Sequence, residues 1–144
     1  MKFIILLHVL AATIWVGGHL VLAIGILPAV LKNRDVDLLQ SFESRYEKVG
    51  MPALLILVIT GIYMALNYLP FGQWFDFSNH LSKHISLKLI WLGLTVVFAL
   101  NARFRVIPNL SAKTLPVMGF HIISVTLLSI LFLITGLSFR LNFF

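Results

Sequence analysis

Four long apolar segments constrain the fold of this chain more than any other feature. They cover residues 3–31, 51–69, 85–107 and 115–139, and each is close to or longer than the roughly 20 residues that a helix needs to cross a bilayer. Only 11% of the residues are charged, against about a quarter in an average soluble domain. The sequence therefore predicts an all-α integral membrane protein, with residues 1–144 forming one domain built as a four-helix transmembrane bundle.

The basic residues between these segments predict the orientation. The connections at 32–50 and 108–114, with the adjoining helix end, hold seven of the eleven Lys and Arg residues. Because cytoplasmic loops are enriched in Lys and Arg, we expect both termini on the periplasmic side of a bacterial inner (plasma) membrane. The net charge of +6 has the same origin, so it indicates membrane lipid as a partner and not nucleic acid. The first apolar run is longer than that of a signal peptide, so we expect it to be a retained helix.

Histidines inside the apolar segments are the main indication of function, because ionisable side chains are costly in a bilayer. His8 and His19 are eleven residues apart, which puts them on one helix face about 16 Å apart along the axis. The topology puts His84 near the level of His8, and His121 near the level of His19. Two imidazole pairs at two depths are typical of a di-haem b cytochrome. The leading hypothesis is therefore a b-type haem protein with two haem b groups, bound by these two pairs, that transfers electrons within or across the membrane.

Neighbouring residues fit this hypothesis and also have simpler explanations. Trp15 lies between the two haem levels or fills the core, and Gly18 admits a flat macrocycle or allows close helix packing. Arg103 and Arg105 pair with haem propionates or only set the topology. Lys88 has the same role at the other level, or extends its amine to the interface. A quinone or small redox molecule would be the electron partner, and small bundles of this kind also form homodimers. The residues leave open whether the protein is an enzyme; a haem-dependent oxidoreductase would be the natural class.

A copper site is the alternative. His80 and His84 are four residues apart, so a helix puts them on one face, a spacing that suits a bound metal. Met118 and His121 are three apart, and thioether with imidazole favours Cu(I). Methionine is also the usual gap-filler of apolar cores. This alternative predicts a copper-binding or copper-transport membrane protein.

The helices also resemble a known family. Three stretches carry the resemblance: "LHVLAATIWVGGHLVLAIGILPAVL", "SRYEKVGMPALLILVITGIYMAL" and "LKLIWLGLTVVFALNARFRVIPNL". Their distinctive residues are His8, Trp15, Gly17, Gly18, Arg45, Gly61, Lys88, Asn101, Arg103 and Pro108. In these the chain is similar to the CopD (copper resistance protein D) family of bacterial inner-membrane proteins, which implies copper uptake or resistance. A related group, the HemJ-type protoporphyrinogen oxidases, binds haem b through a helix-one histidine and a later lysine. That further resemblance implies roles for His8 and Lys88, whereas His19, His84 and His121 are additional to its pattern and fit a second haem.

Overall fold

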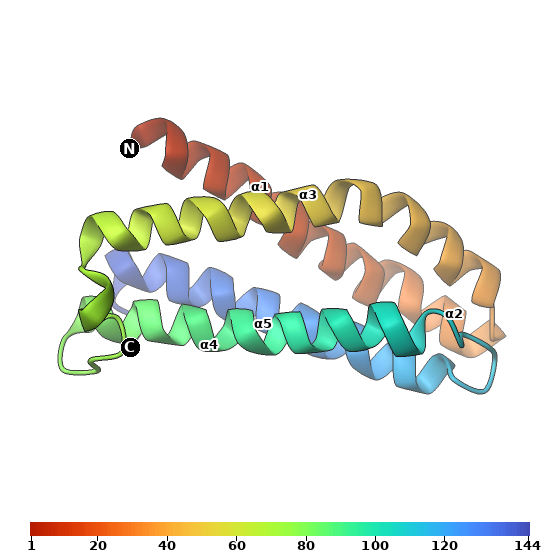
Figure 1. The fold of residues 1–144 in the computed structure, drawn as a ribbon. Coiled ribbons are helices and arrows are strands. Elements are labelled where there is room, and N and C mark those ends of the chain that lie inside the picture. Colours follow the sequence, from red (N-terminus) through yellow and green to blue (C-terminus); the bar gives the residue numbers. More distant parts are fainter.

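The structure, a computed structural model that describes residues 1–144, contains helices and no strands (Figure 1). The helical segments are α1 (Lys2–Leu20), η1 (Val21–Ile26), α2 (Leu27–Asn33), α3 (Val36–Tyr68), η2 (Phe71–Gln73), α4 (His80–Asn101), η3 (Ala102–Val106) and α5 (Leu115–Leu141). They form four continuous helical runs that are long and apolar enough to cross a membrane: Lys2–Asn33, Val36–Tyr68, His80–Val106 and Leu115–Leu141. The prediction of an all-α chain with four membrane helices is confirmed.

The four runs pack as an antiparallel bundle in which α1 and α5 are the two inner helices. Helix α1 packs against α3 and α5, and α5 packs against α4. The two termini lie at the same end of the bundle, on the left of Figure 1. We call this the terminal end, and we call the opposite end the distal end. The assignment of the terminal end to the periplasm stays a prediction.

Two helices widen into π-helical turns just before a proline. Segment η1 precedes Pro28, and η3 precedes Pro108. A proline lacks the backbone N–H and its ring collides with the carbonyl four residues earlier, so the preceding turn must change. At the second site Ile107 N–H donates to the carbonyl of Ala102, five residues back, at 2.8 Å. The helix therefore continues through the widened turn toward the distal end.

The first connection is much shorter than the stretch 32–50 that separates the first two apolar segments in the sequence. Only Arg34 and Asp35 separate α2 from α3, and the Asp35 carboxylate accepts a hydrogen bond from Leu38 N–H at 3.0 Å. This cap starts α3 well before the apolar segment 51–69, so the first turns of the helix contain charged residues. The extension brings Glu47 to Arg103 of η3, with a 2.7 Å ion pair. Helix α4 also starts earlier than expected, at His80 and not at 85, because the Asn79 side chain caps it.

The densest apolar packing is at the distal end. Eight buried residues of η1, α2, α3, η3 and α5 form one core cluster: Leu22, Leu27, Val30, Leu39, Val106, Leu115, Met118 and Ile122. Nearby, Tyr46 of α3 lies across Gly18 of α1 and donates its hydroxyl to the carbonyls of Ile14 and Trp15 at 3.0 and 3.1 Å. A Cβ at Gly18 would overlap the tyrosine ring, so this glycine makes room for the Tyr46 side chain between α1 and α3.

Replacing Gly18 with alanine should therefore destabilise the protein, whereas Gly17→Ala should not. The added methyl at 18 displaces the Tyr46 ring, and overpacking of this kind costs about 1–3 kcal/mol. At Gly17 a Cβ meets no atom within 4 Å, and alanine in a helix is favoured by roughly 0.5–1 kcal/mol. Thermal unfolding in detergent measures both changes. Equal midpoints for the two variants would contradict the contact.

Candidate functional site

His84 is the most unusual polar residue of the terminal end. Its side chain is fully buried, and its Nδ1 lies 2.6 Å from the carbonyl oxygen of His80. The His80 ring is 4.0 Å away between centroids, and the ring of Phe144 stacks on His84 at 5.0 Å. The Nε2 atom of His84 is the one buried side-chain nitrogen or oxygen in the protein that has no hydrogen-bond partner. The lone pair of His84 Nε2 is thus unused, and the imidazole of His80 lies next to the His84 ring.

His8 lies at the same end but faces α3. Its Nδ1 is 2.7 Å from Oγ1 of Thr60, which itself donates to the carbonyl of Ile56 at 2.6 Å. The threonine proton is already used, so His8 Nδ1–H donates and the threonine oxygen accepts. The Nζ atom of Lys88 lies 5.6 Å from the centre of the Phe139 ring, and Lys88 makes no ion pair.

His19 belongs to the aromatic contacts between α1 and α3. Its Nδ1 lies 2.8 Å from the carbonyl oxygen of Trp15. The indole of Trp15 is 4.5 Å from the His19 ring, and Tyr46 meets the ring edge-on at 5.6 Å. Trp15 and Gly18 therefore have defined packing roles here: the indole covers the imidazole, and the glycine makes room for the tyrosine.

His121 differs from the other membrane histidines because both of its ring nitrogens are paired. Nδ1 lies 2.9 Å from the carbonyl oxygen of Val117, and Nε2 lies 2.7 Å from Nδ2 of Asn101 on α4. The carbonyl can only accept, so Nδ1 carries the proton and Nε2 accepts from the amide. Sequence reasoning gave Asn101 no role, although an amide inside an apolar segment is a signal for such a pair.

The same geometry recurs in all four histidines. Each donates Nδ1–H to an oxygen, which is the i−4 backbone carbonyl in His19, His84 and His121 and the Thr60 hydroxyl in His8. This bond fixes the neutral tautomer whose lone pair is on Nε2. It is also the usual arrangement of a histidine that binds a metal, in which the other ring nitrogen donates to a carbonyl. Three of the four histidines, His8, His19 and His84, thus present an Nε2 that accepts no hydrogen bond.

The structure brings some of the predicted site residues together and separates others. His80 and His84 are in contact, whereas Met118 and His121 lie at the distal end because α4 and α5 run antiparallel. The predicted four-residue copper set is therefore divided between two ends, and Met118 belongs to the apolar core cluster. No three His, Asp or Glu side chains gather in a group that could hold a metal ion.

The residues of the haem hypothesis have separate neighbours. His8 contacts α3, whereas His84 contacts α5 through the tilted ring of Phe139. Arg103 pairs with Glu47, and Arg105 is exposed at the same end. The pairing of His8 with His84 and of His19 with His121 on haem iron stays a prediction.

The fold and these side chains define a multi-pass membrane protein whose helices carry imidazoles in their interior. The family profile described as CopD, copper resistance protein D, matches residues 40–138, which is more than half of the chain. The chain belongs to the CopD family. No curated protein and no solved structure matches it. The matched region contains His80, His84 and His121, and it begins after the helix of His8 and His19.

We expect the four membrane histidines to carry a proton on Nδ1. Nitrogen-15 NMR of histidine-labelled protein distinguishes the two ring nitrogens, and single His→Gln variants assign the signals. His84 should show a bare Nε2, whereas the Nε2 of His121 should show the shift of a hydrogen-bond acceptor from Asn101. The exposed His80 serves as the reference for a ring in water. A proton on Nε2 of His84 would contradict this geometry.

Proposed function

We propose that the protein binds copper in the context of copper resistance, and that His80 and His84 capture the ion at the terminal end. The observation that carries this proposal is the buried Nε2 of His84, which has no hydrogen-bond partner. Leaving such an atom unpaired costs about 1–3 kcal/mol, and buried polar groups without a partner are rare. A metal ion bound to this lone pair would offset that cost.

The chemistry of the two residues suits copper. Imidazole is a good ligand for copper, and the His80 carbonyl already holds the His84 ring in the tautomer that leaves Nε2 free. His80 is exposed at the start of α4, so it is accessible to an incoming ion, whereas His84 is buried. Two protein ligands leave other coordination positions open. An open site exchanges its ion more readily than a closed four-ligand site.

His8 and His19 extend the proposal from binding to transport. A charged ion is costly in the apolar part of a bilayer, so its passage requires polar side chains inside the helix bundle. Both histidines have an Nε2 with no donor, and eleven residues of α1 separate them, about 16 Å along the axis. In this proposal they are the next ligands for copper on the way to the distal end, which in a bacterial inner membrane would be the cytoplasmic side.

The family supports copper and gives no support for haem. Haem coordination by His121 would also require the loss of its hydrogen bond from Asn101, because that bond occupies the Nε2 lone pair. Electron transfer by two haems, and a HemJ-like oxidation of porphyrinogen at His8 and Lys88, therefore have weaker support than copper binding. Quinone or another small redox molecule as a partner belongs to those hypotheses.

Copper binding by the purified full chain in detergent tests the proposal. We expect one Cu(I) per chain under reducing conditions, measured by competition with a chromophoric Cu(I) chelator and by elemental analysis. His80→Ala should weaken the affinity about tenfold or more, because it removes a ligand from an exposed position without opening the core. His84→Ala should do the same.

His121→Ala is the matched control. It also removes a buried membrane histidine, but the Nε2 that it removes is already paired with Asn101, so copper affinity should not change. Equal copper affinity in the wild type and in His80→Ala would contradict the proposed site. A purified chain that lacks copper and shows the Soret absorption band of haem would favour the haem hypothesis instead.

A further inference from the structure

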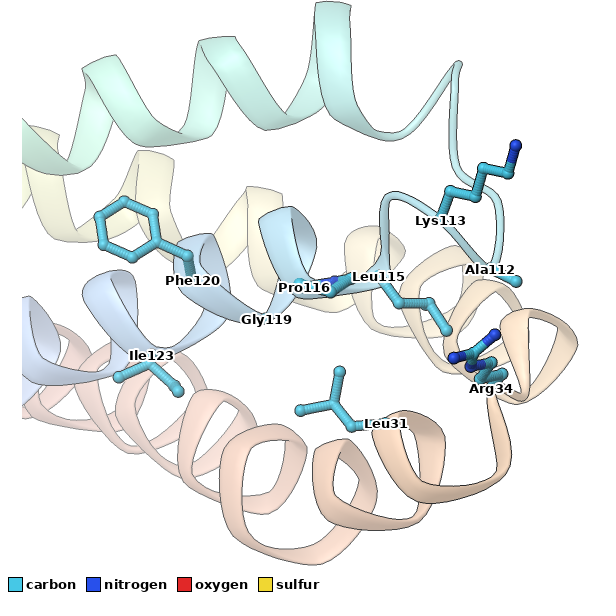
Figure 2. A pocket seen from close by; sticks show the side chains of 9 residues that line it. All are labelled: Leu31, Arg34, Ala112, Lys113, Leu115, Pro116, Gly119, Phe120 and Ile123. Carbon is cyan, nitrogen blue, oxygen red and sulfur yellow. The ribbon is translucent and has the colours of Figure 1, made fainter.

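A groove between α2 and the start of α5 lies at the distal end, away from the proposed copper site. Its volume is about 720 Å³, and Figure 2 shows the side chains that line it. The lining changes character along its length. Arg34 and Lys113 lie at one end, and Leu31, Phe120 and Ile123 lie toward the other (Figure 2). No acidic side chain lines it.

The charged end lies where membrane helices end. Arg34 follows the last residue of α2, and Lys113 lies two residues before α5 begins. The side chains of both residues are exposed, and neither forms an ion pair, because the one ion pair in the protein joins Arg103 to Glu47. Basic residues that flank the apolar spans of a membrane protein commonly lie near the lipid headgroups. We therefore expect these two unpaired cations near the phosphates of the bilayer.

Arg34 occupies a backbone conformation that is unfavourable for it. Its φ is 50° and its ψ is 42°, so it ends α2 in the left-handed region. Glycine or asparagine commonly occupies this position, because a side chain with a Cβ is strained there. An arginine ends a helix less favourably than a glycine does. Unlike glycine, Arg34 has a long cationic side chain, and this side chain lines the groove.

The apolar end is open to the membrane. Leu31, Phe120 and Ile123 are all exposed, although they lie on helices that are apolar enough to cross a bilayer. Gly119 forms part of the same lining, and a Cβ there would lie 3.7 Å from Leu31, so the groove has no bulky side chain at that point. These residues form the apolar part of the groove, which lies next to the part lined by Arg34 and Lys113.

We propose that this groove binds one anionic phospholipid. The phosphate lies between Arg34 and Lys113, and an acyl chain runs along Leu31, Phe120 and Ile123. The order of cations and then apolar side chains matches the order of headgroup and chain in a lipid. Guanidinium recognises phosphate oxygens through paired hydrogen bonds, and basic pockets between membrane helices are typical sites for anionic headgroups. Bound there, the lipid joins α2 to α5. This proposal does not depend on copper binding.

Native mass spectrometry of the full chain in detergent tests the proposal with phosphatidylglycerol and phosphatidylcholine of identical chains. We expect one phosphatidylglycerol to bind at least tenfold more tightly than phosphatidylcholine. The double variant Arg34→Gln, Lys113→Gln should lose this preference. Arg34→Gly with Lys113→Gln should lose it too, although glycine relieves the left-handed conformation. That second variant separates loss of binding from loss of folding.

Arg105→Gln is the matched control, because Arg105 is an exposed cation of the distal end that does not line the groove. It should keep the preference for phosphatidylglycerol. Inorganic phosphate and glycerol phosphate, which have no acyl chains, should not displace the lipid at equal concentration. Equal binding of the two lipids, an equal loss in Arg105→Gln, or displacement by inorganic phosphate would each overturn the proposal. The last result would identify a simple anion site.

Discussion

The pairing of polar side chains inside a bilayer is the constraint on which the rest of this structure depends. With no water available, each helix satisfies its own polar side chains. Thr60, Thr95, Thr126, Thr135 and Ser138 all donate to the carbonyl four residues earlier. The imidazoles of His19, His84 and His121 use the same bond. Nδ1 of each ring is thus used within its own helix, and the chemistry of the site follows from what meets Nε2.

The prolines determine how the distal end is built. The π-helical turn η1 lets the first helical run continue past Pro28 into α2 and reach the short connection at Arg34. The turn η3 ends the third run at Val106, before Pro108, and places Arg103 beside Glu47. The wide turns also contribute Leu22 and Val106 to the core cluster. That cluster keeps α2 next to α5, so the groove is a consequence of the same packing. Apolar packing is therefore densest at the distal end, whereas aromatic rings surround His84 at the terminal end.

The sequence was sufficient for the membrane helices and not for their contacts. The length of the apolar segments predicted four spans, and the helical period predicted that His8 and His19 share one face of the first span. Neither property indicates which neighbouring helix a side chain meets. The fit of Tyr46 against Gly18 depends on a 28-residue separation that no local pattern encodes, and Asp35 starts α3 inside the stretch between the first two apolar segments. Asn101 shows the same limit: its amide was visible in the sequence, but its partner His121 was not.

His84 and His121 differ in the environment of Nε2, which is paired in His121 and has no partner in His84. Both rings are buried, and both donate Nδ1–H to the carbonyl one turn earlier. In His121 a second helix supplies an amide to Nε2, so the ring joins α4 to α5 and its lone pair is used. In His84 the neighbours are the rings of His80, Phe139 and Phe144, and none of them donates to Nε2. Burial of the ring is thus common to both, and the neighbouring side chain decides whether Nε2 joins two helices or has no partner. By the same argument an Asn101→Leu substitution would make His121 resemble His84, and it would leave one more Nε2 without a partner in the bundle.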